Sequence, residues 1–244
     1  MTTRARLVLT GPTGVGKTEY MNALMELLPV EVINMDSIQV YSFFRIGPGR
    51  SDARHGVRRH LYGYLSPHDT LDVASYVRNA TAVADEIELY GQLPMFEGGS
   101  RSLLPALRAA LPLKIFGIRP PDDLEWRRAR LRQRVDGYFQ DDLLVREIQE
   151  AQRLGYGDTR LMRDPLVYMQ TRDYLAGKLT LEECKRAMVE SMLQMQDAQL
   201  GVFNPLPDIT WVTAGKDSPA ELARQLKLWL EESGWRSALR GRSP

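Results

Sequence analysis

LVLTGPTGVGKTEYMNALMELL, residues 7–28, is the stretch that decides the fold. An apolar run leads into the octapeptide GPTGVGKT, and a segment with apolar residues at helical spacing comes next. The octapeptide fits the phosphate-binding pattern GxxxxGK[ST] at Gly11, Gly16, Lys17 and Thr18. Its glycines permit a tight turn whose backbone N–H groups face phosphate oxygens, and the next helix adds its positive N-terminus. The sequence therefore predicts a strand, a phosphate-binding loop and a helix.

Short apolar runs recur along the rest of the chain, and several of them end at glycine or proline. Helical patterns lie between them at Thr18–Leu28 and Leu71–Tyr90. Strands that alternate with helices and are apolar on both faces form parallel sheets. We therefore predict an α/β fold, a P-loop NTPase-like parallel five-stranded sheet flanked by helices. The predicted strands are Arg6–Thr10, Val32–Met35, Pro94–Glu97, Lys114–Ile118 and Ile209–Thr213.

A long helical segment separates the fourth predicted strand from the fifth. Residues 122–196 show no clear strand, which indicates a lid or small subdomain beside the ligand edge of the sheet. Thr180 and Glu183 have the spacing of a capping box, and Ser218 with Pro219 marks the start of a last helix. We expect an α/β core of residues 1–121 and 207–234, a helical lid of residues 122–206 and a flexible tail of residues 235–244.

The composition is that of a globular protein with balanced charge. The 244 residues are 43% hydrophobic, and 32 basic against 31 acidic residues leave a net charge of +1. A protein that grips a large nucleic acid usually carries a basic excess, so we expect no nucleic-acid partner. One cysteine, Cys184, allows no internal disulfide, and no run approaches the ~20 apolar residues of a membrane span. We expect a cytoplasmic monomer without a signal peptide or membrane contact.

The loop by itself leaves the fate of the phosphate open. A hydrolase pairs such a loop with an acidic residue at the end of an apolar strand. Asp36 and Glu97 stand at such strand ends. A small-molecule kinase would also want arginines on a lid, and five arginines lie between Arg127 and Arg134.

The order of these motifs resembles the isopentenyltransferase family, which includes tRNA dimethylallyltransferases and the adenylate isopentenyltransferases that make cytokinins. The resemblance begins with GPTGVGKT followed by an apolar strand and DSIQVY, residues 36–41. The turn EGGS, residues 97–100, is similar to the adenylate enzymes, whereas tRNA enzymes usually have GGTGLY. Further similar segments are RIGPGR at 45–50, RRHLYGYLSPHDTLDVASY at 58–76, RQRVDGYF at 132–139 and LVYMQTRDYLAGKLTLEE at 166–183.

The resemblance implies that the loop holds the diphosphate of dimethylallyl diphosphate, or of its hydroxylated relative, as a leaving group. The exocyclic amine of an adenine attacks the allylic C1, and a carboxylate that accepts its proton assists the attack. Mg²⁺ and basic groups neutralise the charge that develops on the diphosphate. The implied catalytic residues are Asp36 as the base, Thr13 as a donor to the bridging oxygen, and Lys17 and Arg134 on the diphosphate.

The remaining site residues come from the same resemblance. Thr18 is the predicted magnesium ligand. The predicted diphosphate-binding residues are Gly11, Pro12, Thr13, Gly14, Val15, Gly16, Lys17 and Thr18. The predicted acceptor-binding residues are Asp36, Ser37, Gln39, Gly49, Arg50, Gly99, Ser100, Asp164 and Tyr168.

The segment after the EGGS turn predicts the acceptor. tRNA enzymes of the family carry a long helical insertion there, but here GGSRSLLPALRAA, residues 98–110, runs directly into the next strand. The chain also departs from the adenylate enzymes, with Pro48 in place of a serine and Leu166 in place of a second aspartate. We predict an adenylate dimethylallyltransferase whose substrates are dimethylallyl diphosphate and AMP. The alternatives are a tRNA A37 dimethylallyltransferase and a P-loop small-molecule kinase.

Overall fold

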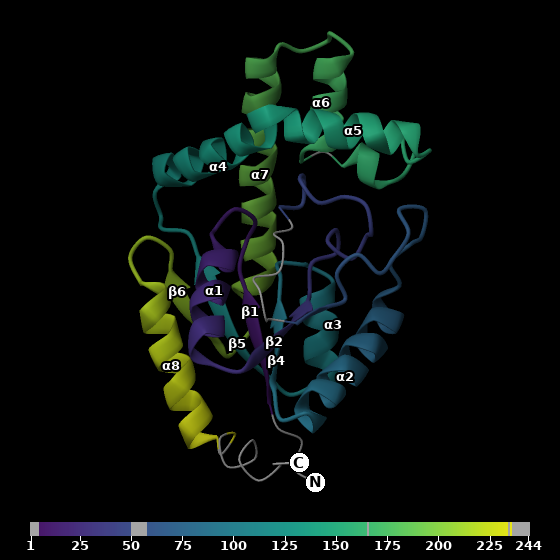
Figure 1. Cartoon of the computed structure of the whole chain (residues 1–244). Helices are drawn as coiled ribbons and strands as arrows, with labels where there is room; N and C mark the ends of the chain where they lie inside the picture. Colours follow the sequence, from purple (N-terminus) through teal and green to yellow (C-terminus); the bar gives the residue numbers. More distant parts are fainter. Residues whose placement is uncertain (1–4, 50–57, 165, 234, 236–244) are drawn as a thin grey trace.

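The computed structural model describes residues 5–49, 58–164, 166–233 and 235. A parallel sheet has helices on both faces, and a layer of helices crosses its upper edge (Figure 1). The strands are β1 (Arg6–Thr10), β2 (Val30–Asn34), β3 (Arg59–His60), β4 (Leu93–Glu97), β5 (Leu113–Arg119) and β6 (Ile209–Thr213). The α-helices are α1 (Lys17–Leu27), α2 (Val73–Leu89), α3 (Leu103–Ala110), α4 (Leu124–Phe139), α5 (Leu143–Arg153), α6 (Tyr168–Leu175), α7 (Leu181–Phe203) and α8 (Pro219–Glu232).

The sheet has the order β3-β2-β4-β1-β5-β6, and every neighbouring pair is parallel. Strand β1 therefore lies inside the sheet, and the carboxyl ends of all strands meet at one edge. The predicted α/β fold with a parallel sheet is confirmed, but the described residues form six strands rather than the predicted five. The additional strand is β3, whose two residues are too few to show a periodic pattern.

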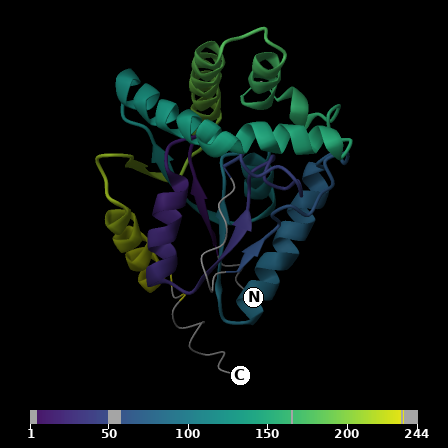
Figure 2. The same ribbon diagram turned by 45° about the horizontal axis from the view of Figure 1, so that its top comes forward.

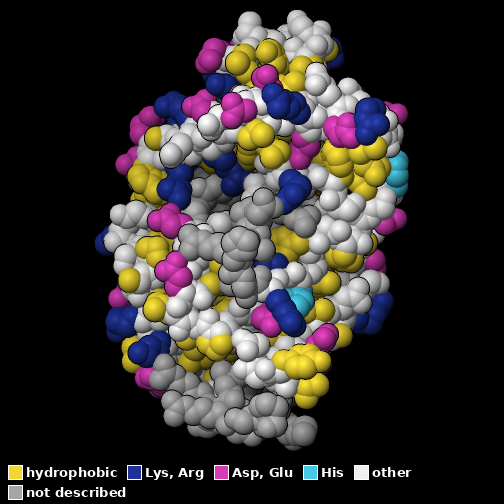
Figure 3. Space-filling view, in the orientation of Figure 1, with side chains coloured by type: hydrophobic (Ala, Val, Ile, Leu, Met, Phe, Trp, Pro, Cys, Tyr) yellow, Lys and Arg dark blue, Asp and Glu magenta, His cyan; other side chains and the backbone are white. Residues whose placement is uncertain are grey.

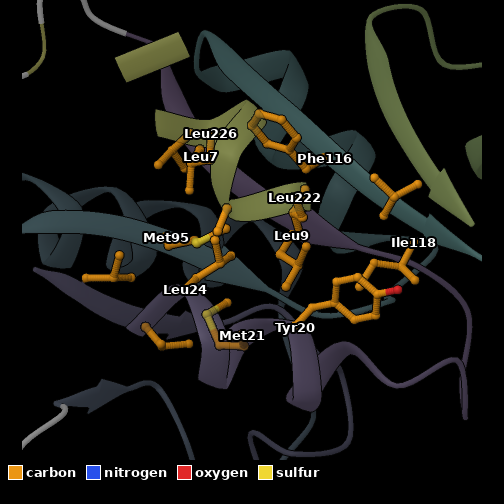
Figure 4. Packing of buried hydrophobic residues seen from close by; sticks show 14 of the residues in the cluster. Leu7, Leu9, Tyr20, Met21, Leu24, Met95, Phe116, Ile118, Leu222 and Leu226 are labelled. Atoms are coloured by element: carbon orange, nitrogen blue, oxygen red, sulfur yellow. The ribbon is translucent and has the colours of Figure 1, made fainter. Parts of the chain in front are cut away.

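Alternate residues of β1 pack on opposite faces of the sheet, because successive side chains of a strand point to opposite sides. Leu7 and Leu9 join the core beneath α1 and α8, where Figure 4 shows Leu7 beside Leu226 and Leu9 beside Leu222. Val8 joins the core beneath α2 and α3. Burial on both faces explains why β1 reads as a continuous apolar run.

Helices α4, α5, α6 and α7 lie in the layer above the sheet, here called the lid after the predicted one, and they share a hydrophobic core with Val40, Tyr41 and Phe44 of the segment after β2. Leu131 of α4, Ile148 of α5 and Met188 of α7 are all buried in it. Helix α7 is long enough to leave the lid, and Phe203 at its end packs in the core beneath α2 and α3. Figures 1 and 2 show α7 running from the lid toward the sheet. One helix thus belongs to both parts.

The ends of two helices have the caps that the sequence predicts. Thr180 and Glu183 form a complete capping box at the start of α7. The Ser218 side chain accepts a hydrogen bond from the Glu221 backbone at the start of α8, with Pro219 in the first turn. Among the helices of the described ranges, none has the length and apolar content needed to cross a membrane.

Candidate active site

The candidate site lies where the carboxyl ends of β1, β2 and β4 meet beneath the lid, the usual ligand edge of a parallel sheet. A cavity of about 380 Å³ opens there. Figure 3 shows Lys and Arg side chains at the upper rim of a hollow below the lid. This first cavity is lined by Thr13, Gly14, Gly16, Lys17, Thr18, Asp36, Gln39, Pro48, Gly49, Glu97, Gly98, Arg130, Gln133, Arg134 and Gln199.

The loop between β1 and α1 requires its glycines. Gly14 and Gly16 have φ angles of 71° and 101°, a region that residues with a Cβ rarely adopt. A Cβ on Gly11 would lie 2.3 Å from the Ile118 carbonyl oxygen of β5. The backbone therefore turns closely against β5 and α4. Of the predicted diphosphate-binding residues, Gly11, Pro12 and Val15 do not line the cavity, and the Val15 side chain is buried in the core.

Lys17 lies over the loop that precedes it. Its Nζ donates to the carbonyl oxygens of Gly11 at 2.9 Å and Pro12 at 3.0 Å. Burial lowers the pKa of Lys17, and the nearby charges of Glu97 and Asp36 oppose this effect. A half-buried cation with two acidic neighbours at a phosphate-binding loop is suited to bind a polyanion.

Asp36 comes after β2 and faces both the loop and the lid. Its Oδ1 accepts hydrogen bonds from the backbone N–H groups of Ile38 at 2.8 Å and Gln39 at 3.2 Å. One carboxylate oxygen therefore holds the turn after β2. The other has no hydrogen bond to a described residue, and the side chain lines the cavity. Asp36 thus stabilises the turn after β2 with one oxygen and leaves its other oxygen as a hydrogen-bond acceptor at the cavity.

Glu97 ends β4, is half-buried and lines the first cavity, although the sequence assigned it no role beyond an acidic strand end. The Tyr62 hydroxyl donates to its Oε2 at 3.0 Å. Burial raises the pKa of Glu97, and the charge of Lys17 opposes this rise. Lys17, Asp36 and Glu97 thus bring three charged groups together in the first cavity.

Two of the five arginines of α4 line the first cavity. Arg130 donates through Nε to the Gly14 carbonyl at 3.2 Å. Arg134 donates to the Tyr138 hydroxyl at 2.5 Å and to the Pro48 carbonyl at 3.2 Å. The sequence indicated Arg134 but not Arg130. The spacing of four residues, which puts two side chains on one helix face, is the signal that could have found it.

A second cavity of about 220 Å³ adjoins the first. Five residues line both cavities: Thr13, Asp36, Pro48, Arg134 and Gln199. Of the predicted acceptor-binding residues, Asp36, Ser37, Gly99, Ser100, Asp164 and Tyr168 line the second cavity. Gln39 and Gly49 line the first cavity instead, and Arg50 lies outside the described residues.

Two predicted acceptor residues have partners inside the protein. Asp164 Oδ1 accepts from the Leu166 backbone at 2.8 Å, and burial raises the pKa of this carboxyl. Tyr168 donates its hydroxyl to Glu147 Oε2 at 2.7 Å, and burial raises the pKa of this phenol well above its usual value. Tyr168 thus contributes its ring to the second cavity and its hydroxyl to a structural bond.

Glu147 of α5 holds a loop of the site in place, and no sequence pattern indicated it. Its Oε1 accepts from the backbone N–H groups of Arg45 at 2.6 Å and Ile46 at 2.8 Å, and its Oε2 accepts from Gly47 at 3.4 Å. The bonds connect residues about a hundred positions apart. Local patterns carry no information on such a contact.

Magnesium stays a prediction, and the side chains of the first cavity fit it. Mg²⁺ prefers oxygen ligands and keeps several waters, so one or two protein ligands beside substrate phosphates suffice. The Thr18 hydroxyl and the Asp36 and Glu97 carboxylates supply such oxygens. No group of three or more His, Cys, Asp or Glu side chains suited to a metal occurs in the described part of the chain.

Comparisons with known proteins agree on one family. Residues 39–112 match the model of the IPP transferase family. The tRNA dimethylallyltransferase of Fervidobacterium nodosum is 29% identical over 68% of this chain and 54% of the relative. That of Desulfotalea psychrophila is 34% identical over 64% of this chain and 50% of the relative. The chain spans about half the length of these curated relatives.

Solved structures show the same fold. The full-length tRNA isopentenylpyrophosphate transferase of Bacillus halodurans matches with a TM-score of 0.83 and 22% identity, over 95% of this chain and 98% of that protein. A eukaryotic dimethylallyltransferase acting on tRNA matches with a TM-score of 0.71 and 16% identity, over 96% of this chain and 78% of that protein.

These findings correct two sequence-based predictions. The prediction of AMP as acceptor, with cytokinin synthesis, is wrong, because the relatives and structural neighbours are named for tRNA. The expectation of no nucleic-acid partner is wrong for the same reason. The net charge of the whole chain did not reveal that several arginines line the two cavities. Residues 39–112 of this chain are thus similar to the IPP transferase family, and about two thirds of the chain is similar to tRNA dimethylallyltransferases.

Proposed function

We propose that this chain transfers a dimethylallyl group from dimethylallyl diphosphate to the N6 amine of an adenine in tRNA and releases diphosphate. The observation that carries the proposal is the meeting of two cavities at Thr13, Asp36 and Arg134. One cavity contains a phosphate-binding loop, and the other has apolar side chains beside polar ones. The family match and the tRNA-named relatives support the choice of reaction and acceptor.

The first cavity binds the diphosphate in this proposal. Backbone N–H groups of the loop, Lys17 Nζ and the guanidinium groups of Arg130 and Arg134 surround the space for it. They oppose the negative charge that grows on the leaving group as the C–O bond breaks. Mg²⁺, held at the Thr18 hydroxyl, would add positive charge to the same oxygens.

The second cavity receives the reacting carbon chain and the adenine edge. Leu166, Met192 and Met195 supply apolar contacts for the isoprenoid group. Asp36 stands at the junction with one carboxylate oxygen outside the turn hydrogen bonds. This oxygen accepts the amine proton as the new C–N bond forms, the usual role of a general base.

An RNA acceptor must present one adenine outside its stack. Extruding a base costs a few kcal/mol, which contacts to the flanking nucleotides must offset. Arg101 and Arg160 line the second cavity, and neither side chain has a hydrogen bond or ion pair with another described residue. Their charges are available to the phosphates on either side of the reacting adenine.

The test uses labelled dimethylallyl diphosphate, Mg²⁺ and a tRNA transcript with adenine at position 37. The control transcript carries guanine at that position. We expect label in the first RNA and none in the second, and none in AMP supplied at the same concentration. Label in AMP alone would contradict the acceptor. Consumption of the γ-phosphate of ATP with a small acceptor would favour a kinase instead.

A further inference from the structure

One residue at the junction of the two cavities has no part in the proposed chemistry. Gln199 lines both cavities together with Thr13, Asp36, Pro48 and Arg134. It lies on α7, and only 9% of its surface is exposed. A buried amide beside reacting groups needs partners, because an unpaired polar group in a protein interior is costly.

Both polar atoms of the Gln199 side-chain amide form hydrogen bonds to the backbone of the site. Its Oε1 accepts from the Thr13 backbone N–H at 2.8 Å, and its Nε2 donates to the Gly99 carbonyl at 2.7 Å. Thr13 belongs to the loop after β1, and Gly99 belongs to the turn after β4. One side chain of the lid helix therefore links two segments of the sheet edge.

Gln196 completes the arrangement three residues earlier on the same face of α7. It is 2% exposed, and its Nε2 donates to the Thr13 carbonyl at 2.8 Å. Its Oε1 accepts from Arg127 Nε of α4 at 2.8 Å. Both backbone polar groups of Thr13 are thus bonded to glutamine side chains of α7. We call Gln196 and Gln199 the glutamine pair.

This arrangement is unusual for a phosphate-binding loop, whose backbone N–H groups ordinarily face the ligand. The Thr13 N–H instead faces the protein, which fixes the peptide planes on either side of this residue. The Thr13 side chain still lines both cavities, and its hydroxyl has no hydrogen bond to a described residue. With the Thr13 backbone fixed, rotation about χ1 is the only way to change the position of the hydroxyl oxygen.

We propose that the glutamine pair consists of positioning residues for the transfer reaction. This role rests on the proposed function. Gln199 and Gln196 hold the Thr13 backbone in place, so that the Thr13 hydroxyl can donate to the bridging oxygen of the diphosphate. A donor fixed before the substrate arrives needs no reorganisation during the reaction. Since α7 also packs in the lid core, the position of the lid determines the position of this donor.

The test compares Gln199→Leu with Gln170→Leu. Gln170 is a matched control, a buried glutamine of α6 with 7% exposure that donates to Ser191 and does not touch the loop. Thermal unfolding, binding of inorganic diphosphate by calorimetry, and kcat and KM for tRNA are measured. We expect similar losses of thermal stability. Gln199→Leu alone should lower kcat, by ~10²-fold, because a displacement of about 1 Å suffices for that, with the KM for tRNA unchanged.

A double-mutant cycle tests whether Gln199 acts through Thr13. Thr13→Ala and Thr13→Ala/Gln199→Leu should have equal kcat values, because residues that act as one unit are not additive. Losses that multiply would overturn the proposal, and so would equal effects of Gln199→Leu and Gln170→Leu on kcat. Gln196→Leu repeats the cycle if Gln199→Leu does not fold.

Diphosphate binding separates this inference from the reaction itself. If the wild-type protein labels no tRNA, the proposed function fails. Calorimetry with inorganic diphosphate can then still test whether the glutamine pair affects diphosphate binding to the loop. Gln199→Leu should weaken that binding by about tenfold, the effect of losing a hydrogen bond that orders the loop. Addition of Thr13→Ala should weaken it no further. Unchanged binding in Gln199→Leu would overturn the proposal whatever the acceptor.

Discussion

Asp36 shows how one residue serves structure and chemistry at once. Its Oδ1 holds the turn after β2, and its other oxygen faces the junction of the two cavities. Asparagine can keep the Oδ1 acceptor but cannot take a proton. We therefore expect Asp36→Asn to fold and to bind inorganic diphosphate like the wild type. Its kcat should fall by about 10²–10⁴-fold, the usual contribution of a general base.

Single-turnover labelling of tRNA measures this loss apart from product release. A variant that retains a rate within about threefold of wild type would remove Asp36 from the role of base. Weaker diphosphate binding with an unchanged rate constant would instead assign Asp36 to the leaving group.

Asp164 gives a prediction about pH. Burial raises the pKa of this carboxyl above its ordinary value of 3.8. The folded protein then binds the proton more tightly than the unfolded chain. The resulting stabilisation is complete below pH 3.8 and is lost as pH rises through the higher folded pKa. Asp164→Asn has no such proton, so its melting temperature should rise relative to wild type as the pH increases from about 4 to about 7.

The exposed Asp158 provides the matched control in the same segment. Asp158→Asn should show no such trend in the difference from wild type. A constant difference for Asp164→Asn across the same range would show that Asp164 titrates alike in the folded and unfolded states.

At the scale of elements, the loop of residues 45–49 depends on a helix far along the chain. Glu147 of α5 accepts three backbone hydrogen bonds from Arg45, Ile46 and Gly47, and a fourth from Tyr168. The loop in turn lines both cavities with Pro48. Hydrogen bonds to a charged group contribute roughly 1.5–3 kcal/mol each, but this carboxylate is only half-buried and the donors regain water when it is lost.

We therefore expect Glu147→Ala to lower the free energy of unfolding by about 2 kcal/mol, as measured in urea. The control is Glu150→Ala on the same helix, where the carboxylate is bonded to Arg153 on the surface. That substitution should leave the urea midpoint close to that of the wild type, because exposed pairs contribute little. Equal effects of the two substitutions would show that the Glu147 bonds to the loop add nothing to stability.

The elements that could be predicted from the sequence are those with local signals. The phosphate-binding loop, the strand before it, the helix after it and the capping box of α7 all depend on residues within a few positions of each other. Glu147 and Gln199 could not be predicted, because their bonds reach across about a hundred residues or more. Strand β3 was missed since pairing with β2, rather than a pattern of its own, makes it a strand.

At the scale of the whole molecule, the wrong expectation of no nucleic-acid partner came from the total charge of the chain. A net charge of +1 says nothing about where the arginines lie. Arg130 and Arg134 line the first cavity, and Arg101, Arg134 and Arg160 line the second. Acidic residues elsewhere in the chain offset these positive charges in the net charge. Local field, rather than total charge, decides whether a polyanion is attracted to a site.

This local charge leads to a prediction for RNA binding under the proposed function. A basic side chain at a phosphate releases about 0.7 counterions from single-stranded RNA, which sets the slope of log K against log salt. Arg101→Ala and Arg160→Ala should each weaken tRNA binding and reduce that slope by about 0.7. Arg153→Ala is the control, because this exposed arginine lies outside both cavities and pairs with Glu150. Filter binding at several salt concentrations measures all three. If Arg101→Ala and Arg160→Ala leave the slope at its wild-type value, the RNA backbone does not pass the mouth of the second cavity, and the flanking phosphates must be held elsewhere.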